Sequence, residues 1–296
     1  MRIFLTGATG FIGSAIVPEL INAGHQVVGL ARSDANAKAL AAAGAHVHRG
    51  SIEDLDSLRN GASAADGVIH TAFNHDFSKW AENCENDRLA IEALGSALAG
   101  SNRPLVITSG TGLVTRADGR PAAEDDAPTS TVPRIKSEEA ANAMAARGVH
   151  VSFVRLPPSV HGDGDHGFVP TLIRIAREKR TAAYVGEGSN RWPAVHRLDA
   201  AYLFRLALEK GAAGARYHGV GEEGIPFRDI AGIIARRLNV PVVAKTPEQA
   251  AEHFGWFAHF AALNAPASSE RTQNELGWRP THVGLIADLE RGSYFD

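Results

Sequence analysis

The chain opens with RIFLTGATGFIGSAIVPELINAG, residues 2–24, and the order of residue types in this stretch decides the fold class. The apolar run RIFLT predicts a buried parallel strand that ends at Gly7. The segment FIGSAIVPELINAG is amphipathic and stops at Gly24, which is typical of the end of a helix. Gly7, Gly10 and Gly13 therefore belong to a turn that joins a strand to a helix.

Glycines with this spacing let backbone N–H groups approach a pyrophosphate at the N-terminus of the helix, where the helix dipole favours an anion. The alternative is a tight turn that binds nothing. The second apolar run, HQVVGLAR at residues 25–32, completes a strand–helix–strand unit and favours a dinucleotide. The candidate pyrophosphate-binding residues are Gly7, Thr9, Gly10, Phe11, Ile12 and Gly13.

The end of the second predicted strand distinguishes the two nicotinamide cofactors. An NAD site usually places Asp or Glu there to bind the ribose hydroxyls, whereas this strand runs into Ala31, Arg32 and Ser33. A guanidinium at Arg32 suits the 2'-phosphate of NADP, with Ser33 beside it. Alternatively, Arg32 is a solvated loop residue and the cofactor is NAD, because Asp34 follows closely.

Strand and helix patterns go on alternating to about residue 158. Predicted strands at 45–50, 66–73, 104–110 and 149–158 are separated by helical patterns, which indicates an α/β fold with a parallel sheet covered on both faces. The polar segment at 117–128 reads as a loop. The fold class that we expect is a doubly wound Rossmann sheet.

Composition and charge exclude several function classes. The 296 residues are 44% hydrophobic and 21% charged with a formal net charge of −3, and no Lys/Arg tract is present, which argues against a nucleic-acid partner. Neither a signal-peptide pattern nor a long apolar segment is visible, so we expect a cytoplasmic protein without a membrane segment. Cys84 is the single cysteine, which excludes an intramolecular disulfide and a multi-cysteine metal site, and we expect no metal.

Several motifs, in order, resemble those of the extended short-chain dehydrogenases, the NAD(P)-dependent epimerase/dehydratase family. They are TGATGFIG, GSIEDLDSL, DGVIHTA, RLPPSVHGDGD, WPAVHRLDAAYL and SSERTQNELGWRPT. The resemblance implies a Rossmann domain of residues 1–155, to which 194–220 return, and a smaller substrate-binding lobe of 156–193 and 221–296. It also suggests a homodimer. It places Ile52 at the adenine, Thr71 and Ala72 beside the nicotinamide ribose, and Pro157, Ser159 and Val160 along the nicotinamide amide.

The catalytic positions depart from this family, whose reductases use Tyr as the general acid and Lys four residues later. In PTSTVPRIKSEE, residues 128–139, the residue four before Lys136 is Val132. Aligning on Glu138 instead puts Arg134 in the lysine position and Ser130 in the tyrosine position. Neither alignment supplies Tyr, and all four tyrosines of the chain lie beyond this segment. The resemblance is therefore to an atypical subgroup. Arg134 or Lys136 then holds the ribose hydroxyls, or both belong to a solvated helix face.

Other candidates for catalysis follow from the remaining positions. The strand ITSGTGLV offers Ser109 or Thr111 as the hydroxyl that polarises the substrate carbonyl, and Asp87 stands where the family has a catalytic Asn. His75 and Asp76, in FNHDFSKW after the fourth strand, are the candidates for a replacement acid, because imidazole titrates near neutral pH. The alternative is a polar loop in which Asp76 caps the next helix.

We therefore expect an NADP-dependent oxidoreductase that reduces a small, apolar ketone or aldehyde with a proton donor other than tyrosine. A redox-inactive NADP-binding regulatory protein and an epimerase or dehydratase are the alternatives. Aromatic residues of the C-terminal part are more often core than ligand wall, but a site that they lined would take a small apolar or aromatic substrate. They include Phe168, Trp192, Trp256 and Phe260.

Overall fold

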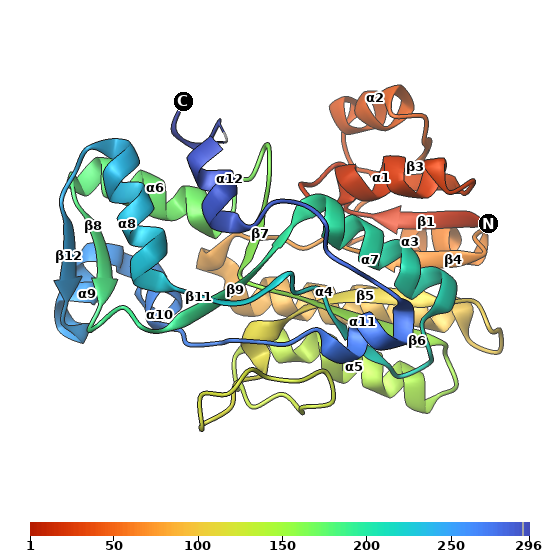
Figure 1. Ribbon diagram of the computed structural model, residues 1–296. Coiled ribbons are helices and arrows are strands. Elements are labelled where there is room, and N and C mark those ends of the chain that lie inside the picture. Colours follow the sequence, from red (N-terminus) through yellow and green to blue (C-terminus); the bar gives the residue numbers. More distant parts are fainter. Residues whose placement is uncertain (292) are drawn as a thin grey trace.

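The computed structural model describes residues 1–291 and 293–296, and a seven-stranded parallel sheet forms its centre (Figure 1). The inner strands form this sheet because their side chains are largely apolar on both faces, whereas the edge strand His46–Arg49 is polar and mostly exposed. The strand order is β10 (Arg216–His218), β6 (Val151–Leu156), β5 (Leu105–Gly110), β4 (Gly67–His70), β1 (Arg2–Thr6), β2 (Gln26–Ala31) and β3 (His46–Arg49). This confirms the predicted doubly wound α/β fold.

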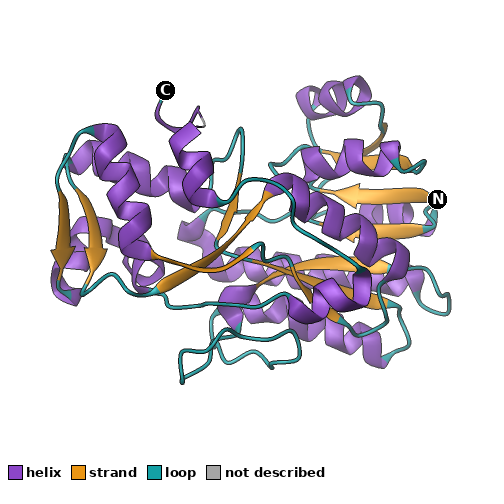
Figure 2. Cartoon of the chain, viewed as in Figure 1, coloured by secondary structure: helices purple, strands orange, loops and turns teal. Residues whose placement is uncertain are grey.

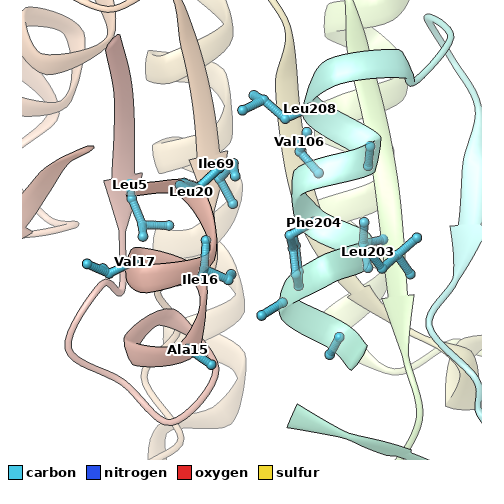
Figure 3. Close-up of a cluster of buried hydrophobic side chains, with 14 of the residues drawn as sticks. Leu5, Ala15, Ile16, Val17, Leu20, Ile69, Val106, Leu203, Phe204 and Leu208 are labelled. Atoms are coloured by element: carbon cyan, nitrogen blue, oxygen red, sulfur yellow. The ribbon is translucent and has the colours of Figure 1, made fainter. Parts of the chain in front are cut away.

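Helices cover both faces of the sheet, as the alternation of patterns predicts. α1 (Gly13–Asn22), α2 (Asp34–Ala42) and α7 (Arg197–Lys210) contribute to one core cluster. α3 (Leu55–Ser63), α4 (Trp80–Leu98) and α5 (Lys136–Ala146) contribute to the other. Figure 3 shows the first cluster, in which Ile16 and Leu20 of α1 and Phe204 of α7 pack around Leu5 and Ile69 of the sheet.

A second lobe continues the chain beyond the sheet (Figure 2). It contains α6 (Phe168–Lys179), α8 (Phe227–Leu238), α9 (Pro247–Phe254), α10 (Ala258–Ala262) and α12 (Leu285–Arg291), with the parallel pair β8 (Ala182–Val185) and β12 (Val242–Lys245). These elements share their own buried cluster, which includes Trp192 and Phe257. A three-stranded sheet joins the two parts in the order β11 (Glu222–Pro226), β9 (Arg191–His196) and β7 (Ser159–His161).

One C-terminal segment, α11 (Glu270–Leu276) with the residues just after it, packs on the domain that contains the seven-stranded sheet. From the sequence, we expect all of residues 221–296 to belong to the smaller lobe. Leu276 and Trp278 lie in the same core cluster as α1 and α7. The indole N–H of Trp278 donates to the carbonyl of Asp199, 3.0 Å away, and the Asp199 carboxylate accepts from the backbone N–H of Thr281 at 3.0 Å. The chain thus returns to the first domain before α12.

Short 3-10 turns flank the carboxyl end of the central strands. η1 (Phe77–Lys79) precedes α4, η2 (Thr111–Leu113) follows β5, and η3 (Pro133–Ile135) precedes α5. Two more, η4 (Gly255–Phe257) and η5 (Ser293–Phe295), belong to the C-terminal part. The first three place the candidate side chains, because ligands of open α/β sheets bind at the carboxyl edge of the strands.

Candidate functional site

The glycine turn has the geometry that a pyrophosphate needs. Gly7 has φ +72°, and a Cβ there would lie 2.6 Å from the backbone nitrogen of Ala72. A Cβ at Gly13 would lie 2.0 Å from the Gly7 carbonyl oxygen, so only glycine allows α1 to begin this close to β1. Gly10 is exposed, and a Cβ there would meet only the Gly7 oxygen, at 3.2 Å. Its backbone is therefore open to a ligand on the outer side.

At the N-terminus of α1 the N–H groups of Ser14 and Ala15 donate to backbone carbonyls at 2.9 Å, so an anion would bind to the N–H groups that precede them. Ile12 stands at the N-cap, and within the described residues no side-chain hydrogen bond caps this end. Arg197 of α7 adds a cation that sequence reasoning missed: its guanidinium lies 4.6 Å from the centre of the Phe11 ring and donates to the hydroxyl of Ser14 at 2.8 Å. The turn therefore fits a dinucleotide pyrophosphate, held by backbone N–H groups and the helix dipole.

The end of β2 carries Arg32, Ser33 and Asp34, all exposed. The Ser33 hydroxyl accepts from the N–H of Asn36 at 3.2 Å and caps α2. Asp34 forms an ion pair with Arg49, which stands opposite Ala31 on β3. The carboxylate two residues after Arg32 is thus already engaged by another arginine, and Arg32 itself is exposed just after β2, at the carboxyl edge of the sheet where ligands bind in such folds.

The other residues that the resemblance assigned to the cofactor lie along the same edge. Thr71 donates its hydroxyl to the carbonyl of Thr6 at 2.8 Å, and the N–H of Ala72 donates to the Thr6 hydroxyl at 3.3 Å. Ile52 packs beside the α3 side of the sheet. Pro157 and Ser159 are buried, Val160 is partly buried, and Ser159 and Val160 belong to β7.

A buried network surrounds Asp87 of α4, whose side chain is 1% exposed. Its carboxylate accepts from Nε2 of His70 at 3.0 Å, from Nη1 of Arg134 at 2.8 Å and from the hydroxyl of Ser137. Burial works to raise the pKa of Asp87, but the nearby Arg134 charge and the hydrogen bonds from His70 and Ser137 outweigh it and lower the pKa to about 2. Asp87 is therefore a fixed anion at neutral pH.

His70 connects this network to the first strand. Its Nδ1 lies 2.7 Å from the Thr6 hydroxyl, while Nε2 faces Asp87. Because the ionised carboxylate can only accept, Nε2 carries the proton and Nδ1 accepts from Thr6. Sequence reasoning missed His70, because it ends the apolar run GVIH and gave no signal beyond its place at the carboxyl end of a strand.

The structure shows that Arg134 and Lys136, between which the sequence did not decide, point in different directions. Arg134, on η3, faces inward: its Nη2 also donates to the carbonyl of Thr108 at 3.0 Å, and its guanidinium lies 4.4 Å from the centre of the Phe73 ring. Lys136 faces outward and pairs with Glu85 at 2.7 Å, with 39% of its side chain exposed. Arg134 is thus the cation that contacts Asp87, and whether it holds the ribose, as the alignment on Glu138 suggests, stays a prediction.

Ser109 and Thr111 are both buried but differ in their partners. The Ser109 hydroxyl donates to Oε1 of Glu138 at 2.7 Å, and Glu138 also accepts two bonds from Arg155. The Thr111 hydroxyl is fully buried and has no hydrogen-bond partner within the described residues. Glu138 and Arg155 were absent from the predicted site, although the charge of Arg155 in the apolar strand VSFVRL was a usable signal.

His75 and Asp76 do not form a pair. The Asp76 carboxylate accepts from the N–H of Ser78 at 3.0 Å and from its hydroxyl at 2.6 Å, so it caps η1 as the alternative interpretation has it. The His75 ring packs edge-on against Phe73, with centroids 5.0 Å apart, although the residue is exposed overall. Packing against neighbouring groups, and secondly the Arg134 charge, lower the pKa of His75.

Asp165 and Cys84 also have shifted pKa values. Burial raises the pKa of Asp165, which follows β7 and accepts from the Tyr294 hydroxyl at 3.1 Å, to about 6. Burial also raises the pKa of the Cys84 thiol to about 11, so this thiol is not an activated nucleophile. No tyrosine in the described part of the chain hydrogen-bonds to Asp87, His70 or Arg134.

The described residues contain neither a helix with the length and apolarity to cross a membrane nor a group of three or more His, Cys, Asp or Glu side chains placed to hold a metal ion. A doubly wound sheet with an open glycine turn at the first strand is the arrangement of the dinucleotide-binding proteins of the Rossmann class. The model of the NAD dependent epimerase/dehydratase family matches residues 3–220, and the chain belongs to this family.

Three known proteins show the range of the similarity. An uncharacterized protein of Schizosaccharomyces pombe is 52% identical over 296 residues, 100% of both chains. A 4-hydroxy-2-methyl-3-oxo-4-farnesyl-3,4-dihydroquinoline-1-oxide ketoreductase of Stigmatella aurantiaca is 27% identical and covers 99% of this chain and 97% of its own. The structure of a dTDP-glucose 4,6-dehydratase from Streptomyces venezuelae, with NAD bound, has a TM-score of 0.79 at 22% identity, over 98% and 96% of the two chains.

Proposed function

We propose that the protein is an NADP-dependent reductase of a small, apolar ketone or aldehyde, and that Arg134, held by Asp87, replaces the tyrosine–lysine pair of the family. The observation that carries the proposal is the buried Asp87–Arg134 ion pair at the carboxyl edge of β4 and β5. What separates this pair from a purely structural one is that the Arg134 side chain stays 15% exposed beside the Phe73 ring, so part of the guanidinium is open to a ligand. The ketoreductase from Stigmatella aurantiaca supports the same reaction class.

When bound, the reduced nicotinamide supplies a hydride, which together with one proton converts the carbonyl compound to an alcohol and leaves the oxidised nicotinamide. The residues of this chain bind the cofactor and stabilise the oxygen on which negative charge develops. Arg134 suits the second task, because its side chain is 15% exposed and a guanidinium has five N–H donors, of which the network uses only part.

The proton comes from a donor other than tyrosine, and we assign it to a water molecule at the exposed side of Arg134. Arg134 itself cannot supply the proton, because a guanidinium does not deprotonate in proteins. His75 is the competing donor, but its lowered pKa leaves little of the imidazole protonated at pH 7, so few molecules carry the proton that the reaction needs. Ser109 already donates to Glu138, and Thr111 is fully buried, so either hydroxyl must change its environment before it polarises a carbonyl.

The preference for NADP rests on Arg32. A carboxylate at this place would accept from the ribose hydroxyls, and the nearby Asp34 is instead paired with Arg49. The Arg32 side chain is exposed and offers a bidentate partner to a 2'-phosphate. The variant Arg32→Ala is expected to weaken NADPH binding about tenfold and NADH binding little, in titrations of cofactor fluorescence. Equal losses for both cofactors would remove the 2'-phosphate role.

The direct test is NADPH consumption, followed at the nicotinamide absorbance band, with a panel of small aliphatic and aromatic ketones and aldehydes. If the His75→Ala variant turns over at the wild-type rate, water remains the proton donor. If the variant loses turnover, His75 is the acid. Tight NADPH binding with no oxidation across the panel would favour the redox-inactive regulatory protein. Interconversion of nucleotide sugars with retained cofactor would favour an epimerase or dehydratase.

A further inference from the structure

A series of aromatic contacts begins at Phe73, beside Arg134, and extends to the other lobe. Phe73 follows β4, and its ring carries the Arg134 guanidinium at 4.4 Å and the edge of Trp80 at a centroid distance of 5.4 Å. Phe77 of η1 contacts Trp80 from its own domain and three aromatic residues of the other lobe. These three are Phe168, Trp256 and Phe260.

Phe77 differs from its neighbours because it is stacked twice. Its ring is parallel to Trp80 at 4.9 Å and 17°, and to Trp256 at 4.5 Å and 26°. Two indoles do not fit on one face of a phenyl ring, so they lie on opposite faces. Phe260 meets the ring edge-on at 5.8 Å and 69°. The two indoles thus form a slot that is one aromatic ring thick, and we call Trp80 and Trp256 with the space between them the indole slot.

The ring that fills the indole slot is not part of a core. Phe77 is partly buried, His75, Asp76, Ser78 and Lys79 around it are exposed, and Trp256 is 51% exposed. The short turn is held by the Asp76 cap and by the side-chain amide of Asn83, which donates to the Asp76 carbonyl at 2.9 Å. The Phe77 side chain can therefore leave the slot without opening either hydrophobic core.

Charge around the slot argues against a diphosphate. The arginines of α6 are already engaged: Arg174 pairs with Glu178 at 2.8 Å, and Arg177 donates to the carbonyl of Phe295 at 2.7 Å. Arg134 is paired with Asp87 and keeps only part of its donors, enough for one carbonyl oxygen but not for two phosphates. A nucleotide sugar needs several free cations for its two phosphates, whereas a neutral flat ring needs only the two stacking partners.

We propose that the indole slot binds the planar aromatic ring of the substrate in exchange for Phe77, so that the substrate is an aryl aldehyde or aryl ketone whose carbonyl group reaches Arg134. This inference rests on the proposed reductase function. Phe73 links the two parts, because one ring contacts both the guanidinium and Trp80. Stacking on two indoles adds a selective attraction that a saturated ring of the same size does not receive.

The test compares carbonyl compounds that differ only in the ring: benzaldehyde with cyclohexanecarbaldehyde, and acetophenone with cyclohexyl methyl ketone. The ratio of kcat/KM, aromatic over saturated, is measured in the wild type and in two variants of Trp256. Trp256→Leu is expected to lower this ratio about tenfold, whereas Trp256→Phe keeps most of it. Because intrinsic reactivity cancels between variants, an unchanged ratio in Trp256→Leu would overturn the proposal. NADPH affinity is measured in each variant as a control for folding.

A second measurement separates the slot from the reductase function. Binding of benzyl alcohol and of cyclohexylmethanol, which lack a carbonyl group, is followed by saturation-transfer NMR in the wild type and in Phe77→Ala. Selective binding of benzyl alcohol, stronger in Phe77→Ala, supports the slot even where no carbonyl compound is reduced. Equal reduction of aromatic and saturated carbonyl compounds in every variant would support the reductase function and contradict binding in the indole slot. Equal binding of the two alcohols would also contradict binding in the slot.

Discussion

Two carboxylate–arginine pairs lie near the start of α5, and they differ in how completely their polar groups are satisfied. Glu138 and Arg155 are 1% and 0% exposed and form two parallel bonds of 2.8 Å. The second pair, Asp87 and Arg134, has an equally buried carboxylate, but the arginine side chain is 15% exposed and lies against an aromatic ring. We call them the closed pair and the open pair.

The remaining donors of each arginine show why only one pair suits a reaction. In the closed pair, Arg155 also donates to the carbonyls of Asp126 at 3.1 Å and Glu124 at 3.3 Å, so every side of the guanidinium is engaged. In the open pair, Arg134 turns one face to Phe73 and keeps part of its edge toward solvent. A fully satisfied buried ion pair fixes structure, and one with a free edge can also stabilise charge on a ligand.

The largest effect is expected on breaking the closed pair. Glu138→Ala leaves Arg155 as an unpaired buried charge and removes the acceptor of Ser109, which we expect to cost about 3–5 kcal/mol of the free energy of unfolding. Urea unfolding followed by circular dichroism measures it. The matched control is Glu178→Ala, which breaks an exposed helical pair with Arg174 and should cost under about 0.5 kcal/mol.

A double variant sharpens the explanation of this loss. Glu138→Met combined with Arg155→Met removes both charges and keeps apolar volume, so it should be more stable than Glu138→Ala alone. If the double variant is as unstable as the single one, the cost comes from lost packing and not from an unpaired charge. The closed pair would then not differ from the open one in the way we describe.

The next effect concerns the open pair and is expected in turnover. Arg134→Met removes the cation that Asp87 holds, and we expect kcat to fall about 100-fold, or roughly 2.7 kcal/mol in the activation barrier. Arg134→Lys restores a charge without the planar donors and should recover only part of the loss. Steady-state rates with the best carbonyl substrate measure both. Lys136→Met, which breaks an outward pair with Glu85, is the control and should leave kcat within about twofold.

The comparison also shows which features the sequence could predict. The fold follows from local patterns, because the glycine turn GATGFIG and each apolar run adopt their structure whatever the distant residues are. Asp87 was named because it stands where the family has a catalytic Asn, and its catalytic role stays a prediction. The sequence could not decide between Arg134 and Lys136, because η3 precedes α5 and a 3-10 turn rotates side chains differently from an α-helix. Tertiary contact alone decides which cation faces inward.

His70 and the indole slot show a second limit. A histidine at the end of an apolar strand has no local signal for its partner, and Asp87 lies 17 residues further along the chain. The stacking of Phe77 between Trp80 and Trp256 joins residues of both lobes, so no window of sequence contains it. Such features depend on how distant elements pack, which periodicity does not encode.

The smallest effect is a dependence of stability on pH at the closed pair. His218 donates from Nδ1 to the carbonyl of Ser268 at 2.8 Å, so its Nε2 is unprotonated where it faces Nη1 of Arg155, 3.4 Å away. Burial, and secondly the Arg155 charge, lower the pKa of His218 from 6.5 to about 4. The unfolded chain takes up a proton below about pH 6.5 and the folded one resists until about pH 4, so acid favours unfolding between these values.

At pH 5 this difference should have removed about 2 kcal/mol of the free energy of unfolding relative to pH 7. Urea unfolding at both pH values, in the wild type and in His218→Gln, measures it: the variant should lose about 2 kcal/mol less than the wild type on acidification. His46→Gln changes an exposed histidine and should follow the wild type. If His218→Gln loses as much stability as the wild type, His218 accepts a proton without disturbing Arg155. The closed pair would then tolerate a cation beside it, and full satisfaction of its donors would not be what separates it from the open pair.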